Sequence, residues 1–120
     1  MRLIIHIGTP KAGSSSLQVA LDTNRSRLLE QGILYPKIER ATHQSSLASG
    51  LHAPQAMRDI DLRRNGNDPA KVVRKTEAAW QSLADQVSRR NPETLLLSAE
   101  NFMSIDDFAT LRGWLTRIAP

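Results

Sequence analysis

The stretch over residues 2–31 constrains the fold more than any other, because a strand, a glycine-bracketed loop and a helix follow one another directly. Residues 2–8 are apolar and rich in isoleucine without strict alternation, which is typical of a strand buried on both faces of a parallel sheet. From Ser14 onward, apolar side chains recur at helical spacing until Gly32, at Leu17, Leu21 and Leu28. The pattern predicts one helix from about Ser14 to Gln31.

The next part of the chain continues the alternation of strands and helices. Residues 33–36 predict a second short strand, and residues 37–67 predict short helices and loops. Asp68 is placed as an N-cap, with Pro69 at the first helical position, for a long helix. The apolar face of that helix comprises Val72, Val73, Thr76, Ala79, Trp80, Leu83 and Val87.

The last part of the chain predicts one more strand and one more helix. The strand covers residues 94–98 and is of the buried type, and Ser104 with Asp107 predicts a helix start whose apolar face comprises Phe108, Leu111, Leu115 and Ile118. This alternation is expected of an α/β fold in which helices cover a parallel sheet. Because three strands make a thin sheet, we expect residues 1–120 to be the N-terminal part of a single domain.

The loop over residues 8–16 has the composition of an anion site. Backbone N–H groups and the positive end of the helix dipole converge on a loop between a strand and a helix. Gly8 and Gly13 allow close backbone approach, Lys11 adds a positive charge, and three serines add hydroxyl donors. The P-loop of nucleoside triphosphatases requires a lysine where this chain has Ser14. The loop therefore predicts a phosphate site that departs from the P-loop pattern.

The loop resembles the 5'-phosphosulfate-binding loop of sulfotransferases, whose pattern is Thr-x-Lys-x-Gly-Ser/Thr-Ser/Thr-Ser/Thr-Leu. The matching residues are Thr9, Lys11, Gly13, Ser14, Ser15, Ser16 and Leu17. Bacterial sulfotransferase-like proteins commonly share further features that this chain has, namely Gln18, a helix containing Asn24, the segment Gly32-Ile33-Leu34-Tyr35-Pro36 and the segment Ser98-Ala99-Glu100-Asn101. The resemblance implies a P-loop-like three-layer fold, truncated after the third strand and its helix. It also implies a sulfotransferase that uses 3'-phosphoadenosine-5'-phosphosulfate as its donor.

The resemblance assigns roles to the loop. The donor's phosphosulfate would be bound by Thr9, Lys11, Ala12, Gly13, Ser14, Ser15 and Ser16, and Lys11 would stabilise charge on the leaving bridging oxygen. The family's 3'-phosphate contacts usually include an arginine and a serine that we expect to lie past the last residue here. We therefore expect the 120-residue chain to be marginally stable, prone to self-association through an exposed sheet edge, and catalytically silent by itself.

Sulfuryl transfer to a hydroxyl or amine acceptor needs a base, and two residues are candidates. Glu100 follows the third predicted strand, at the end where ligands bind in open α/β sheets, and related sulfotransferases place a histidine or glutamate at a similar point. His43 has a suitable unperturbed pKa. A capping or ion-paired role for Glu100 and a solvated role for His43 are the alternatives. His6 and Trp80 are predicted to be core residues.

Composition excludes several classes of function. The formal charge of +4 and a pI of about 10.1 suit an anionic partner, but the basic residues are scattered and aromatic residues are few, so nucleic acid is not predicted. Without cysteine there is no disulfide or thiolate, and no histidine or carboxylate cluster has the spacing of metal ligands. No apolar run approaches the ~20 residues that cross a bilayer. We expect a cytoplasmic protein that uses no metal.

Two other functions compete with sulfuryl transfer. A P-loop kinase or NTPase would use Mg²⁺ and a lysine at position 14, and a non-catalytic nucleotide-binding domain would need only the loop. The acceptor stays open among carbohydrate, lipid, protein and small alcohol.

Overall fold

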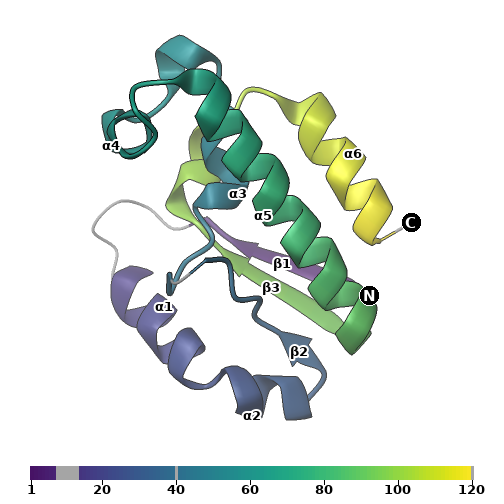
Figure 1. Ribbon diagram of the computed structural model, residues 1–120. Helices are drawn as coiled ribbons and strands as arrows, with labels where there is room; N and C mark the ends of the chain where they lie inside the picture. The colour runs from purple at the N-terminus through teal and green to yellow at the C-terminus, as the bar shows by residue number, and fades with distance from the viewer. Residues whose placement is uncertain (8–13, 40, 120) are drawn as a thin grey trace.

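The computed structural model describes residues 1–7, 14–39 and 41–119 (Figure 1). Three strands, β1 (Arg2–His6), β2 (Ile33–Leu34) and β3 (Thr94–Ser98), form a parallel sheet in the order β1-β3-β2. The predicted parallel α/β arrangement is therefore confirmed, and so are the bounds of the third strand. The second strand is shorter than predicted, because pairing stops at Leu34.

The helix that follows the first strand is interrupted, so the prediction of one continuous helix was wrong. α1 spans Ser14–Thr23 and α2 spans Arg25–Glu30. Between them Asn24 has φ −104° and ψ 17°, and its side-chain amide donates to the carbonyl of Ala20 at 2.7 Å. An asparagine side chain competes with the backbone for such carbonyls, which explains a break at this residue.

The middle segment consists of short helices, as predicted. They are α3 (Ser46–Ser49), the 3-10 helix η1 (Pro54–Ala56) and α4 (Asp59–Arg64). The long helix α5 (Pro69–Arg90) follows, and its predicted cap is confirmed because the Asp68 carboxylate accepts from the backbone N–H of Ala70 at 3.0 Å.

The core lies between α5 and one face of the sheet. Leu95 and Leu97 of β3 are fully buried there, together with Trp80 and Leu83 of α5. The indole N–H of Trp80 donates to the carbonyl of Leu47 at 2.8 Å, which ties α5 to α3. Burying each of these side chains stabilises the fold by about 1.5–3 kcal/mol. Trp80 is a core residue, as predicted.

The last helix begins later than predicted. A 3-10 helix, η2 (Glu100–Ser104), follows β3, and α6 spans Phe108–Ile118. The Asp107 carboxylate accepts from the backbone N–H of Thr110 at 3.1 Å, so Asp107 caps α6 and the predicted cap at Ser104 was wrong.

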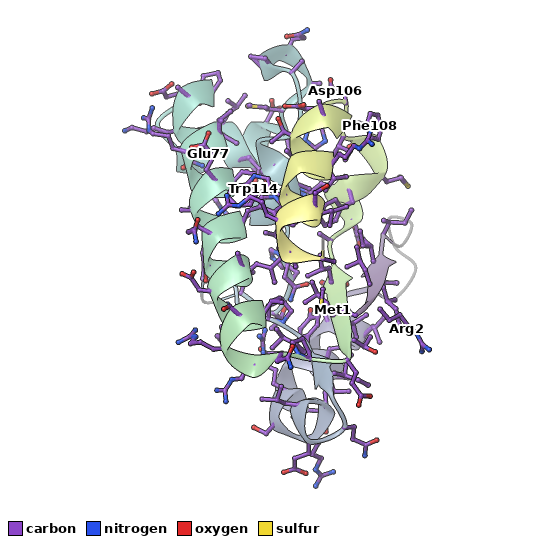
Figure 2. The ribbon with its side chains drawn as sticks, turned by 90° about the vertical axis from the view of Figure 1, so that its right-hand side faces the viewer. Met1, Arg2, Glu77, Asp106, Phe108 and Trp114 are labelled. Carbon is purple, nitrogen blue, oxygen red and sulfur yellow. The ribbon has the colours of Figure 1, made fainter. Side chains whose placement is uncertain are left out.

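The face that α6 turns toward the core also differs from the prediction at two residues, Trp114 and Phe108. Trp114 stacks on Trp80 with 6.0 Å between the ring centroids, so it faces α5 (Figure 2). Phe108 points away from α5 and is 65% exposed, beside an apolar groove of about 530 Å³ that Met1 and Leu3 also line. Leu111 and Leu115, one and two turns further along α6, do pack on the core as predicted.

The opposite face of the sheet is less covered. β1 has no buried residue and its Ile4 is 44% exposed, because β1 is an edge strand, so the prediction of a first strand buried on both faces was wrong. Leu17 and Val19 of α1 are 42% and 53% exposed. Leu17 is therefore exposed, although its helical spacing predicted a position on the apolar face of the helix. Self-association through this exposed edge stays a prediction. Within the described ranges, no helix is both long and apolar enough to span a membrane.

Candidate functional site

The predicted donor-binding loop falls largely outside the described residues. This applies to Thr9, Lys11, Ala12 and Gly13, and to the side chains of Ser14 and Ser15. The backbone of Ser14 and Ser15 opens α1, and Ser16 is exposed in the same turn. The described residues that border this loop are the end of β1 and the start of α1.

These two ends meet β3 at the carboxyl end of the sheet. The Ser98 hydroxyl accepts from the Gln18 side-chain amide at 3.1 Å and lies 2.9 Å from Nδ1 of His6. A hydroxyl has one proton and two acceptor positions, so Ser98 can serve both partners. Ser98 and Gln18 are buried, and His6 is half-buried rather than fully packed as predicted. These contacts fix the start of α1 against the ends of β1 and β3.

Gln44 brings the middle segment to the same point. Its side-chain oxygen accepts from the Ser98 backbone N–H at 2.6 Å, and its own backbone N–H donates to the Ser98 carbonyl at 3.0 Å. Its side-chain amide donates to the carbonyl of Pro36 at 3.0 Å. Because β2 pairs only with Thr94 and Leu95, Gln44 supplies the partners that Ser98 needs on that side of β3.

A polar cavity of about 250 Å³ lies beside this junction. Its lining comes from α1, from the turn before α3, from α4 and its N-terminal flank, and from the residues after β3: Gln18, His43, Ser45, Arg58, Ile60, Arg64, Ala99 and Glu100. The two candidate bases, His43 and Glu100, thus line one cavity although they are far apart in the sequence. Glu100 lies directly after the buried Ala99, at the predicted end of the sheet.

His43 is held as a neutral ring. Its Nδ1 accepts from the backbone N–H of Ser45 at 3.2 Å, so the proton of the neutral ring is on Nε2. Burial lowers the pKa of His43 below its ordinary value of 6.5, and the nearby guanidinium groups of Arg58 and Arg64 lower the pKa further. At neutral pH the ring therefore offers a hydrogen-bond donor at Nε2.

The two arginines of the cavity differ in their partners. Arg58 forms a two-pronged ion pair with Asp61, at 2.7 and 3.1 Å. Arg64 makes no ion pair within 4.0 Å with any carboxylate in the described part of the chain. Glu100 likewise makes no ion pair within 4.0 Å with any described lysine, arginine or histidine. The cavity thus has one cation and one carboxylate whose charges are not matched by a described neighbour.

Sequence reasoning missed both arginines and Gln44. The spacing of Arg58 and Asp61 indicates an i, i+3 pair, but nothing in it shows that α4 packs beside His43. An isolated glutamine in a polar segment gives no sign of burial. These positions depend on contacts between segments distant in the sequence.

Comparison of the chain with protein-family models, with curated proteins and with solved structures finds no match.

Proposed function

We propose that this chain carries the donor-binding and base-bearing part of a sulfotransferase. The substrates would be 3'-phosphoadenosine-5'-phosphosulfate and a hydroxyl or amine acceptor. The observation that carries the proposal is the cavity that His43, Glu100 and Gln18 all line, at the carboxyl end of the sheet. Gln18 directly follows the loop motif Thr9–Leu17, so donor and acceptor would approach one another at this place.

In the proposed reaction Glu100 is the general base. The acceptor oxygen attacks the sulfur, its proton passes to the Glu100 carboxylate, and the bond from sulfur to the bridging oxygen breaks. Lys11 stabilises the negative charge on the released phosphate oxygen. We assign His43 the role of a hydrogen-bond donor and not that of the base. Its neutral ring carries the proton on Nε2, which can donate to a sulfuryl oxygen.

The P-loop-like character of the fold belongs to the same proposal. A parallel strand that leads through a glycine- and lysine-containing loop into a helix supports it, since helix N-termini favour phosphate groups. The rival P-loop kinase would place a lysine at position 14, where this chain has Ser14.

A calorimetric titration separates the two functions. We expect adenosine 3',5'-bisphosphate, the desulfated donor, to bind at least about tenfold more tightly than ATP with Mg²⁺, because the loop has Ser14 at the position where a P-loop has its lysine. Tighter binding of ATP with Mg²⁺ would replace the sulfotransferase by a kinase or NTPase.

The role of Glu100 is tested by transfer of a labelled sulfuryl group in the natural protein. We expect Glu100→Gln to lower the transfer rate by about 10²- to 10⁴-fold while donor binding is kept. Glu93→Gln is the matched control, since exposed Glu93 precedes β3 at the opposite end of the sheet. Equal rates for the two variants would exclude Glu100 as the base.

A further inference from the structure

We propose that the acceptor carries a carboxylate, and that Arg64 binds it. This inference rests on the proposed function, and it names the acceptor class for the same cavity. The carboxylate would lie where the main cavity joins a second, narrower one. The reactive hydroxyl would then lie in the main cavity, which Glu100 lines.

The second cavity has a volume of about 90 Å³. It shares three lining residues with the main cavity, namely His43, Ser45 and Arg64, so the two spaces adjoin at these side chains. A cavity needs only about 10–15 Å³ of space open to a water-sized sphere to hold one water molecule, so the narrow space has room for a carboxylate.

Most hydrogen-bond donors around the narrow cavity are already used within the fold. The Thr76 hydroxyl donates to the Ser46 carbonyl at 2.7 Å, and the Ser49 hydroxyl donates to the Ser45 carbonyl at 2.9 Å. The Asn65 amide donates to the Asp61 carbonyl at 2.7 Å. Of the residues that line both cavities, Arg64 and the Nε2–H of His43 are thus donors left for a ligand, and only Arg64 carries a positive charge.

The pattern of ion pairs around the two cavities also favours Arg64 as the residue that binds the carboxylate. Asp61 is paired with Arg58, and Glu39 is paired with Lys75 at 3.8 Å. Among the described residues that line the cavities, the unmatched charges are those of Arg64 and Glu100. A ligand with one carboxylate matches Arg64, and its hydroxyl proton can pass to Glu100. A guanidinium binds a carboxylate through charge-assisted hydrogen bonds that are stronger than neutral ones.

The test compares D-glucuronate with D-glucose, which differ only in the carboxylate, by NMR titration without donor. We expect glucuronate to bind about tenfold more tightly, the effect of one charge-assisted hydrogen bond. Arg64→Ala should abolish this preference and Arg64→Lys should keep part of it. Arg63→Ala is the matched control, because Arg63 is exposed on the same helix and lines neither cavity. A preference that survives Arg64→Ala overturns the proposal.

A second arm asks whether the anion bound by Arg64 belongs to the donor instead. Adenosine 3',5'-bisphosphate and adenosine 5'-phosphate are titrated into the parent protein and Arg64→Ala. If Arg64→Ala no longer prefers the bisphosphate over adenosine 5'-phosphate and its binding of glucuronate is unchanged, Arg64 holds the 3'-phosphate of the donor. The acceptor proposal is then wrong. If neither nucleotide binds while glucuronate binding still depends on Arg64, the carboxylate site stands and sulfuryl transfer alone is refuted.

Discussion

Replacing Gln44 by leucine should destabilise the fold far more than the same change at Gln86. Both glutamines bond one backbone N–H and one backbone carbonyl of other residues. Gln44 binds the N–H of Ser98 and the carbonyl of Pro36, and Gln86 binds the N–H and carbonyl of Lys37 at 3.1 and 2.9 Å. The pair therefore has matched hydrogen bonds and differs in burial.

The magnitude follows from that difference in burial. Gln44, Ser98 and Pro36 are fully buried, so Gln44→Leu leaves two backbone groups without partners and without access to water. Each such group costs about 1–3 kcal/mol, and the leucine side chain offsets part of the sum. We expect a net loss of about 2–5 kcal/mol, a large share of the ~5–15 kcal/mol typical of a folded domain. For Gln86→Leu we expect a loss of less than about 1 kcal/mol, because water can replace the lost partners of the exposed Lys37 backbone.

Urea unfolding followed by circular dichroism measures both values. The midpoint should fall sharply for Gln44→Leu with an unchanged slope against urea concentration, and it should barely move for Gln86→Leu. Equal losses for the two variants would show that burial of the Gln44 bonds does not hold the middle segment against β3.

Two further predictions concern the packing of two glycines and the protonation of His43. Gly50→Ala should cost about 1–3 kcal/mol by thermal unfolding, because its new Cβ would lie 2.6 Å from the Thr76 hydroxyl oxygen and 2.8 Å from the Val73 Cα. Gly113→Ala, with no atom within 4 Å of its new Cβ in the described structure, should instead stabilise α6 by about 0.5–1 kcal/mol, and the same sign for both would refute the packing argument. The lowered pKa of His43 means that the unfolded chain binds a proton near pH 6.5 that the folded chain does not, so stability should fall as the pH drops through 6.5 toward the folded pKa. His43→Asn should make this fall shallower, and an unchanged pH profile would contradict the assigned environment.

The fold could be predicted wherever a long segment repeats one pattern. α5 follows an unbroken helical period from the Asp68 cap, and β3 is a continuous apolar run, so both were located correctly. The break at Asn24 and the cap at Asp107 depend on individual side-chain hydrogen bonds, which a periodic pattern does not reveal.

Only part of the candidate site could be predicted from the sequence. Glu100 could be placed because the end of a parallel strand has a fixed location in the sheet. That His43 lies in the same cavity depends on the path of residues 37–67, which Gln44 fixes through contacts with β3 and Pro36. Arg64 reaches that cavity only because α4 packs near α5, a contact without a sequence signature.

Calorimetric titration of adenosine 3',5'-bisphosphate into Lys11→Ala and Lys37→Ala tests the central claim most directly. Lys37 is an exposed lysine 3.7 Å from Asp22, outside the loop motif, and it serves as the control for loss of one positive charge. We expect Lys11→Ala to weaken binding by about 10- to 100-fold, as for a lost charge-assisted phosphate contact, and Lys37→Ala to change it by less than about twofold. Equal effects of the two substitutions would contradict the assignment of the loop as the donor site.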